Sequence, residues 1–201
     1  VDKCNETYRF GDDLAFYRKL ILMHRECANI EILLVNDEFY QLLYRTLEKW
    51  NMNQRAARLV PLDTMKQSIL FHKTSLCELY KYKLYDDIYD DLTQIKKLLD
   101  KVFCDLKIMK SQRRIVGVSK ALHFLLPDLI MPIDGNYTLD AFYGYNKYAN
   151  TANKEFVDFW NIFERSFDIA EKLELRKDDA DGEIWKQSVP KLIDNAVIGL
   201  R

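Results

Sequence analysis

Apolar residues recur along most of the chain at steps of three and four residues, which is the spacing of one face of an α-helix. A first stripe over 16–34 predicts one long helix, and Asn36 is placed to cap the next one. Pro61 ends a polar segment and predicts a further helix that runs from there towards Tyr82. The first half of the chain is therefore predicted to be a series of amphipathic helices.

The same periodicity continues in the second half. A stripe over 88–106 predicts an amphipathic helix, and acidic residues at its start suit the positive end of the helix dipole. Aromatic residues over 156–173 predict another helix with an apolar face. A last helix is expected to begin near Ile184, with Pro190 either kinking it or restarting it.

The fold class follows from this pattern and from the turn formers. No stretch alternates strictly between apolar and polar residues, and the 6 glycines and 4 prolines are too few for a fold of many strands. We expect an all-α domain over 1–201, a compact bundle of roughly seven to nine helices. The bundle is either one body or two lobes, 1–105 and 106–201, around a groove.

The composition adds limits on the class of protein. Hydrophobic residues make up 48% and charged residues 30% of the 201 residues, which is typical of soluble globular proteins. No uninterrupted apolar run is long enough for a membrane span, and the first residues do not resemble a signal peptide. We therefore expect a cytoplasmic, intracellular protein that does not contact the membrane. The sequence leaves the oligomeric state open.

The cysteines and histidines predict no metal site. Cys4, Cys27, Cys77 and Cys104 lie far apart, and the 3 histidines are not at metal-ligand spacing with them. Their expected state is that of reduced thiols in an intracellular protein. No cofactor-binding motif occurs either, so we expect no cofactor.

The charge is balanced overall but uneven along the chain. The net charge is −1, which gives no general attraction to nucleic acid. The segment 106–127, however, contains no acidic residue, and Arg113 and Arg114 are among its basic ones. Such a local basic patch can grip phosphates. Arg55 and Arg58 form a second candidate, where they either bind an anion beside a stacking Trp50 or simply end a solvated helix.

Chemistry is most clearly indicated between Lys120 and Asp134. Ser119 is placed to cap a short helix that begins at Lys120 and that Pro127 closes. The positive end of that helix would favour a neutral, nucleophilic lysine, and Asp134 could then stabilise a cation or position a water. The alternative is an exposed Lys120 and an Asp134 that caps a helix starting near Asn136.

The residues 117–120 and 131–134, with an apolar helix between them, resemble the signature of helix-hairpin-helix DNA glycosylases. The resemblance covers about thirty residues. It implies an all-α fold, DNA as partner, Lys120 as Schiff-base nucleophile and Asp134 as catalytic aspartate. It also implies a hairpin in which Gly117 and Ser119 contact the phosphate backbone, although this chain has one glycine where the family usually has two. The segments 50–55 and 119–124 also resemble uncharacterised prokaryotic proteins, a likeness that implies no activity.

Three side chains are candidates for a base-binding pocket: Trp50, His123 and Tyr137. His123 lies one helical turn beyond Lys120, so it is either a general base on the same face or an interior residue with its hydrogen bonds satisfied. The leading hypothesis is a nucleic-acid-processing enzyme of the DNA N-glycosylase/lyase type. The alternatives are a nucleic-acid-binding domain without catalysis and a helical protein-interaction domain.

Overall fold

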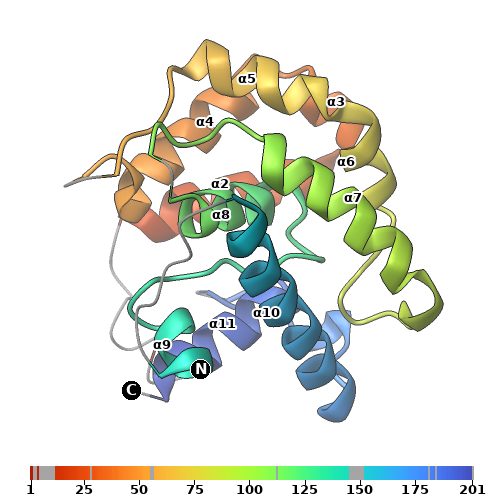
Figure 1. The fold of residues 1–201 in the computed structure, drawn as a ribbon. Coiled ribbons are helices and arrows are strands. Elements are labelled where there is room, and N and C mark those ends of the chain that lie inside the picture. Colours follow the sequence, from red (N-terminus) through yellow and green to blue (C-terminus); the bar gives the residue numbers. More distant parts are fainter. Residues whose placement is uncertain are drawn as a thin grey trace.

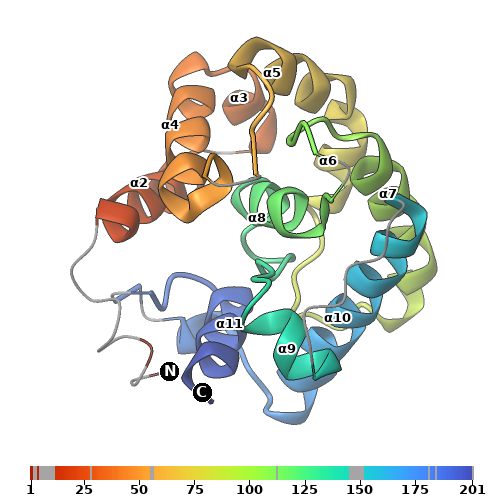
Figure 2. The same ribbon diagram turned by 60° about the vertical axis from the view of Figure 1, so that its left-hand side comes forward.

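One helix, α8 (Ile115–Leu125), runs through the middle of the molecule, and each of its residues except Val116 is buried. The computed structural model in Figures 1 and 2 shows the other helices arranged around it. The structure describes residues 1, 4, 12–27, 29–54, 57–111, 113–144, 152–180, 182–183 and 185–200.

The described residues contain ten α-helices, of which eight have seven or more residues. Before α8 they are α2 (Asp12–Glu26), α3 (Ile30–Leu34), α4 (Asp37–Leu47), α5 (Leu62–Phe71), α6 (Lys73–Leu79) and α7 (Leu92–Asp105). After α8 they are α9 (Thr138–Tyr143), α10 (Ala152–Lys172) and α11 (Val189–Gly199). Shorter turns are the π-helix η1 (Glu48–Met52) and the 3₁₀ turns η2 (Tyr89–Asp91) and η3 (Lys177–Asp179). The predicted all-α bundle is confirmed.

Figure 2 shows α2 to α6 on one side of α8, α7 and α10 on another, and α9 with α11 on a third. The helix α4 contacts both α2 and α8, and α10 contacts α7, α8 and α11. This arrangement follows from the sequence of α8, which is apolar on nearly all its faces and must be covered on each of them.

Two predicted helices are each divided in the structure. The stripe over 16–34 breaks between α2 and α3, where the side chain of Asn29 accepts a hydrogen bond from the backbone amide of Ile32 (3.2 Å) and caps α3. The helix predicted from Pro61 breaks at His72, whose ψ of 10° is not helical. The apolar stripe continues across both breaks, so its period did not reveal them. The predicted Asn36 cap is present, since its side chain accepts from the amide of Glu38 at 2.8 Å.

The helix α8 begins at Ile115, and the predicted start at Lys120 is wrong. The expected cap, Ser119, lies inside the helix, where its hydroxyl donates to the carbonyl of Val116 (3.1 Å) and accepts from the amide of Ile133 (3.1 Å). The cap comes instead from α10, because the buried Glu155 accepts from the amide of Arg114 at 2.8 Å. Lys120 is therefore in the middle of the helix, away from the positive end of the dipole.

The last helix also begins later than predicted. Ile184 lies outside the described residues, and α11 starts at Val189. Ser188 caps it by accepting a hydrogen bond from the amide of Lys191 (3.4 Å), and Pro190 occupies the first turn, where its missing amide hydrogen costs nothing. Pro190 thus starts this helix and does not kink it.

Gly117 allows α8 to pack closely against a neighbouring segment. A Cβ at this position would lie 2.5 Å from Cγ and 2.6 Å from Sδ of Met109. The segment of Met109 is in turn tied to 58–60 by an isolated antiparallel bridge between Leu59 and Met109. Gly117 is therefore needed here for close contact between a helix and a crossing chain.

We expect Gly117→Ala to lower the free energy of unfolding by about 1–3 kcal/mol, because the added methyl overpacks the contact with Met109. In an unconstrained helix interior the same change would raise it by about 1 kcal/mol. Urea unfolding of Gly117→Ala, Met109→Ala and the double variant checks this. The two changes should couple favourably in the double-mutant cycle, and a Gly117→Ala protein as stable as wild type would contradict the prediction.

Candidate functional site

Lys120 and Asp134 face each other across one pocket. The Nζ of Lys120 lies 3.4 Å from Oδ2 of Asp134, and both side chains line a pocket of about 200 Å³. Trp50 and Tyr137, two of the three residues predicted to bind a base, line the same pocket. The structure therefore brings together four residues that the sequence had singled out from three separate segments.

Asp134 faces Lys120 through Oδ2, and the alternative of an exposed Lys120 with Asp134 as a helix cap near Asn136 is not found, because α9 begins at Thr138 without a side-chain cap. The Oδ1 of Asp134 instead accepts a hydrogen bond from the amide of Asn136 (2.8 Å) in the turn before the helix. The backbone amide of Asp134 donates to Oγ1 of Thr138 (2.9 Å), the first residue of α9. This carboxylate is thus fixed by the turn before α9, and its side chain keeps 32% of its surface exposed.

Lys120 is buried at the end of the pocket, with 7% of its surface exposed. Its amine donates to the carbonyl of Trp50 at 3.4 Å and lies 5.7 Å from the centre of the Trp50 ring system. Burial lowers the pKa of Lys120; the negative charges of Asp134 and Asp194 oppose that shift, and the positive charge of Lys191 adds to it. The shift is towards the neutral amine, and its cause is burial and not the helix dipole.

The pocket contains a second buried ion pair that the sequence analysis missed. Lys191 and Asp194, one turn apart on α11, form an ion pair with 5% and 3% of their surfaces exposed. The Lys191 amine lies 5.4 Å from the ring centre of Trp50 and 5.1 Å from that of Trp185. Burial raises the pKa of Asp194 and the Lys191 charge opposes the rise. Two charges inside an otherwise apolar helix were the signal that could have revealed this pair.

His123 lies behind the pocket and does not line it. Its ring is fully buried; Nδ1–H donates to the carbonyl of Ile130 (2.7 Å), and Nε2 accepts from the hydroxyl of Tyr17 (3.2 Å). Burial lowers the pKa of His123 to about 3. These contacts are those of a neutral interior histidine. Both ring nitrogens are hydrogen-bonded within the protein, so neither is available to a substrate.

The predicted phosphate-binding residues are distributed differently from expectation. The guanidinium of Arg114 donates to the carbonyls of Cys104 and Leu106, the latter at 2.6 Å, so it holds the end of α7 and is committed there. Arg58 and Arg113 are exposed, and Arg55 lies outside the described residues.

Gly117 and Ser119 are buried within α8. The glycine hairpin that the resemblance implied is therefore not formed, because this backbone is helical. Its amides are used by the helix, apart from those that Glu155 caps.

No family model, curated protein or solved structure shows significant similarity to the chain. Within the described residues, no group of three or more His, Cys, Asp and Glu side chains could hold a metal ion. Across the same part of the chain, none of the helices has the length and apolar character that a bilayer span requires. The function must therefore be argued from the pocket itself.

We expect Lys191→Met to lower the free energy of unfolding by about 3–5 kcal/mol, because it leaves the Asp194 carboxylate buried without its partner. Replacing both residues, as Lys191→Met with Asp194→Leu, should restore most of the loss. The matched control is the exposed pair of Lys19 and Glu38, whose side chains are 58% and 63% exposed and for which Lys19→Met should cost about 0–1 kcal/mol. Equal effects of the two lysine changes in urea unfolding would contradict the buried pair.

We expect His123 to stay neutral well below the usual titration range of histidine, as the Nδ1–H tautomer. His24 should stay neutral too, as the Nε2–H tautomer, because Nε2 donates to the carbonyl of Phe124 at 2.6 Å and burial lowers its pKa to about 4. Long-range ¹H–¹⁵N NMR spectra of the imidazole nitrogens between pH 7 and pH 5 check both assignments. A midpoint near the ordinary value of about 6.5 for either ring would contradict them.

Proposed function

We propose that this protein processes nucleic acids as a DNA N-glycosylase with lyase activity, with Lys120 as nucleophile and Asp134 as its electrostatic partner. One observation carries the proposal: a buried amine lies 3.4 Å from a partly exposed carboxylate in a pocket with aromatic walls. Burial lowers the pKa of Lys120 and so increases the share of the uncharged amine, which is the nucleophilic form.

In the proposed reaction, Lys120, Asp134 and the aromatic side chains of the pocket each have one role. A flipped nucleotide enters the pocket, and its base stacks on the aromatic side chains of Trp50 and Tyr137. The Lys120 amine forms a bond to C1′ as the glycosidic bond breaks. The amine proton released passes to the departing base, and Asp134 stabilises the positive charge that develops on the sugar. The C1′–O4′ bond then breaks, O4′ takes a proton from water, and a protonated imine forms between Lys120 and C1′. Loss of a proton from C2′ to water allows the 3′-phosphate to leave with the electrons of the C3′–O bond, which completes the β-elimination.

Exposed basic residues near the start of α8 supply a surface for the nucleic-acid backbone. The amide of Lys110 donates to the carbonyl of Arg58 at 2.8 Å, so the segments that carry these two side chains lie side by side. Lys107, Lys110, Arg58 and Arg113 are all exposed. A cluster of this kind can contact several phosphates and makes binding salt-dependent.

Borohydride reduction in the presence of DNA with an abasic site tests the nucleophile, because it traps an imine between an amine and the sugar. We expect a covalent adduct with the wild-type protein and none with Lys120→Arg, which keeps the positive charge. Asp134→Asn should reduce the rate of adduct formation by about a hundredfold. Thermal melting of each variant establishes that it is folded.

The matched control is Lys83→Arg, since Lys83 is also partly buried beside an aspartate but lines a different pocket. It should form the adduct at the wild-type rate. Wild-type protein that binds the DNA but is never trapped would contradict the enzymatic proposal. An adduct that persists in Lys120→Arg and is lost in Lys191→Arg would move the nucleophile to the other lysine of the pocket.

The second candidate is a nucleic-acid-binding domain without catalysis, and the exposed basic residues at 58, 107, 110 and 113 favour it. It predicts DNA binding that weakens steeply with salt and no trapped adduct. Changing Lys107, Lys110 and Arg113 to Gln together should reduce the salt dependence by up to one phosphate contact for each charge removed. Absence of DNA binding at low salt would contradict both candidates and favour a protein-interaction domain.

A further inference from the structure

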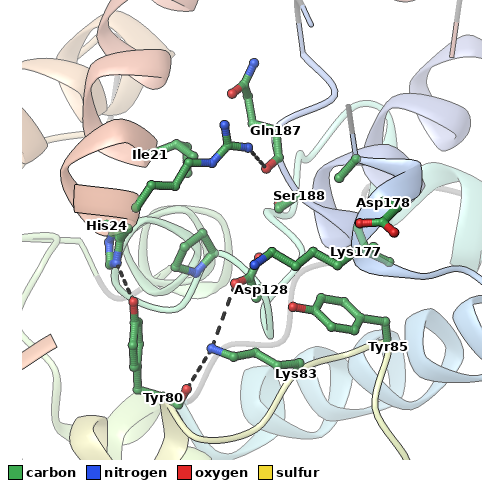
Figure 3. Close-up of a pocket in the computed structure, with 14 residues that line it drawn as sticks. Ile21, His24, Tyr80, Lys83, Tyr85, Asp128, Lys177, Asp178, Gln187 and Ser188 are labelled. Atoms are coloured by element: carbon green, nitrogen blue, oxygen red, sulfur yellow. Dashed lines mark hydrogen bonds and ion pairs between the residues drawn. The ribbon is translucent and has the colours of Figure 1, made fainter. Parts of the chain in front are cut away.

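A second and larger pocket of about 630 Å³ lies apart from Lys120. It is formed by the end of α2, the segment 80–85, the loop at 127–128, η3 and the residues that precede α11. Figure 3 shows residues from these segments around it, with Asp128, Lys83 and Lys177 directed towards one another. Pockets of this size are ordinary for small-molecule ligands, and the mixture of charged and aromatic walls gives this one a distinct chemistry.

Asp128 lies at the centre of this pocket with cations on several sides. Its Oδ2 is 3.8 Å from the amine of Lys83, and Figure 3 shows the side chain of Lys177 reaching towards it from η3. The Asp128 side chain is 34% exposed. Burial raises the pKa of Asp128, and the charges of Lys83, Lys177 and Arg25 work against the rise. One carboxylate thus lies close to Lys83 and within the electrostatic influence of Lys177 and Arg25.

Two of these cations are held in place by the protein. The Lys83 amine donates to the carbonyl of Tyr80 at 2.8 Å and lies 4.3 Å from the centre of the Tyr80 ring. The guanidinium of Arg25 donates to the carbonyl of Gln187 at 3.1 Å. Both groups retain further hydrogen-bond donors, because an ammonium has three and a guanidinium has five. The cations are therefore positioned before any ligand arrives.

The lining residues include three cations and two carboxylates, Asp128 and Asp178. The cations therefore outnumber the carboxylates, and they can bind one anionic group by charge-assisted hydrogen bonds. Asp128 accepts hydrogen bonds and would repel a bare anion, so it suits a ligand that also carries hydroxyl groups. The ring of Tyr85, which Figure 3 shows along one side of the pocket, offers a flat face for the carbon skeleton of such a ligand.

We propose that this pocket binds a sugar phosphate, with the phosphate contacting Arg25, Lys83 and Lys177 and the sugar hydroxyls donating to Asp128. The sugar phosphate is either free or part of a mononucleotide, since both present the same groups. The proposal is independent of the reaction assigned to Lys120, because the two pockets share no lining residue.

Isothermal titration calorimetry with ribose 5-phosphate, 5′-AMP, inorganic phosphate and ribose tests this proposal. We expect binding of ribose 5-phosphate, weaker binding of inorganic phosphate and none of ribose. Lys177→Gln and Lys83→Gln should each weaken ribose 5-phosphate about tenfold or more, because each removes a hydrogen bond to a charged group. Lys81→Gln is the matched control, since Lys81 is exposed, lies two residues from Lys83 and does not line the pocket. A tighter complex with 5′-AMP would identify the nucleotide as the source.

Asp128→Asn separates the proposed contacts. It should weaken ribose 5-phosphate, which loses its carboxylate acceptor, and leave inorganic phosphate unchanged or bound more tightly. If neither ribose 5-phosphate nor 5′-AMP binds the wild-type protein at millimolar concentration, the proposal is overturned. Binding that is equal in wild type and in the Lys83→Gln, Lys177→Gln double variant would overturn it as well. Melting curves of the variants confirm that each is folded.

Discussion

The burial of α8 on all its sides is the constraint on which the rest of the structure depends. A helix that is apolar on nearly every face must be covered by other helices all round, and α4 and α10 are among those that do so. Gly117 lets one crossing segment come close, and Glu155 caps the buried N-terminus from α10. The first amides of a helix have no partner within the helix, and Glu155 supplies one for the amide of Arg114.

This constraint also decides the state of Lys120. A lysine in the middle of a fully covered helix loses its hydration, and an ammonium buried without partners costs several kcal/mol. The structure compensates with the carboxylates of Asp134 and Asp194 and with the carbonyl of Trp50. Replacing such groups by apolar ones would often be neutral or stabilising. A gain in stability alone therefore does not account for their presence around a pocket.

The features that could be predicted from the sequence are those that depend on neighbouring residues. The helical periodicity and the Asn36 cap are local, and both are found. The helix breaks at Asn29 and His72 were not predicted, because the apolar stripe runs through them. The start of α8 was predicted wrongly, because its cap, Glu155, lies 41 residues beyond Arg114 in the chain.

The same distinction applies to the site. The sequence left two alternatives for Asp134, an approach to Lys120 and a helix cap, and the structure shows the approach at 3.4 Å. The pair of Lys191 and Asp194 was not expected, because its place beside Trp50 depends on how α11 docks. The commitment of Arg114 to the end of α7 depends on tertiary structure in the same way.

One short segment, 185–191, forms part of both pockets. Trp185 and Lys191 face the smaller one, while Ser188 and Val189, which lie between them, face the larger one. A shift of this segment at one pocket would therefore move part of the wall of the other. Any ligand that favours one position of the segment will change affinity at the second pocket, and thermodynamic linkage makes that influence equal in both directions. Coupling of this kind would need no long chain of intervening contacts, because residues of one short backbone segment line both pockets.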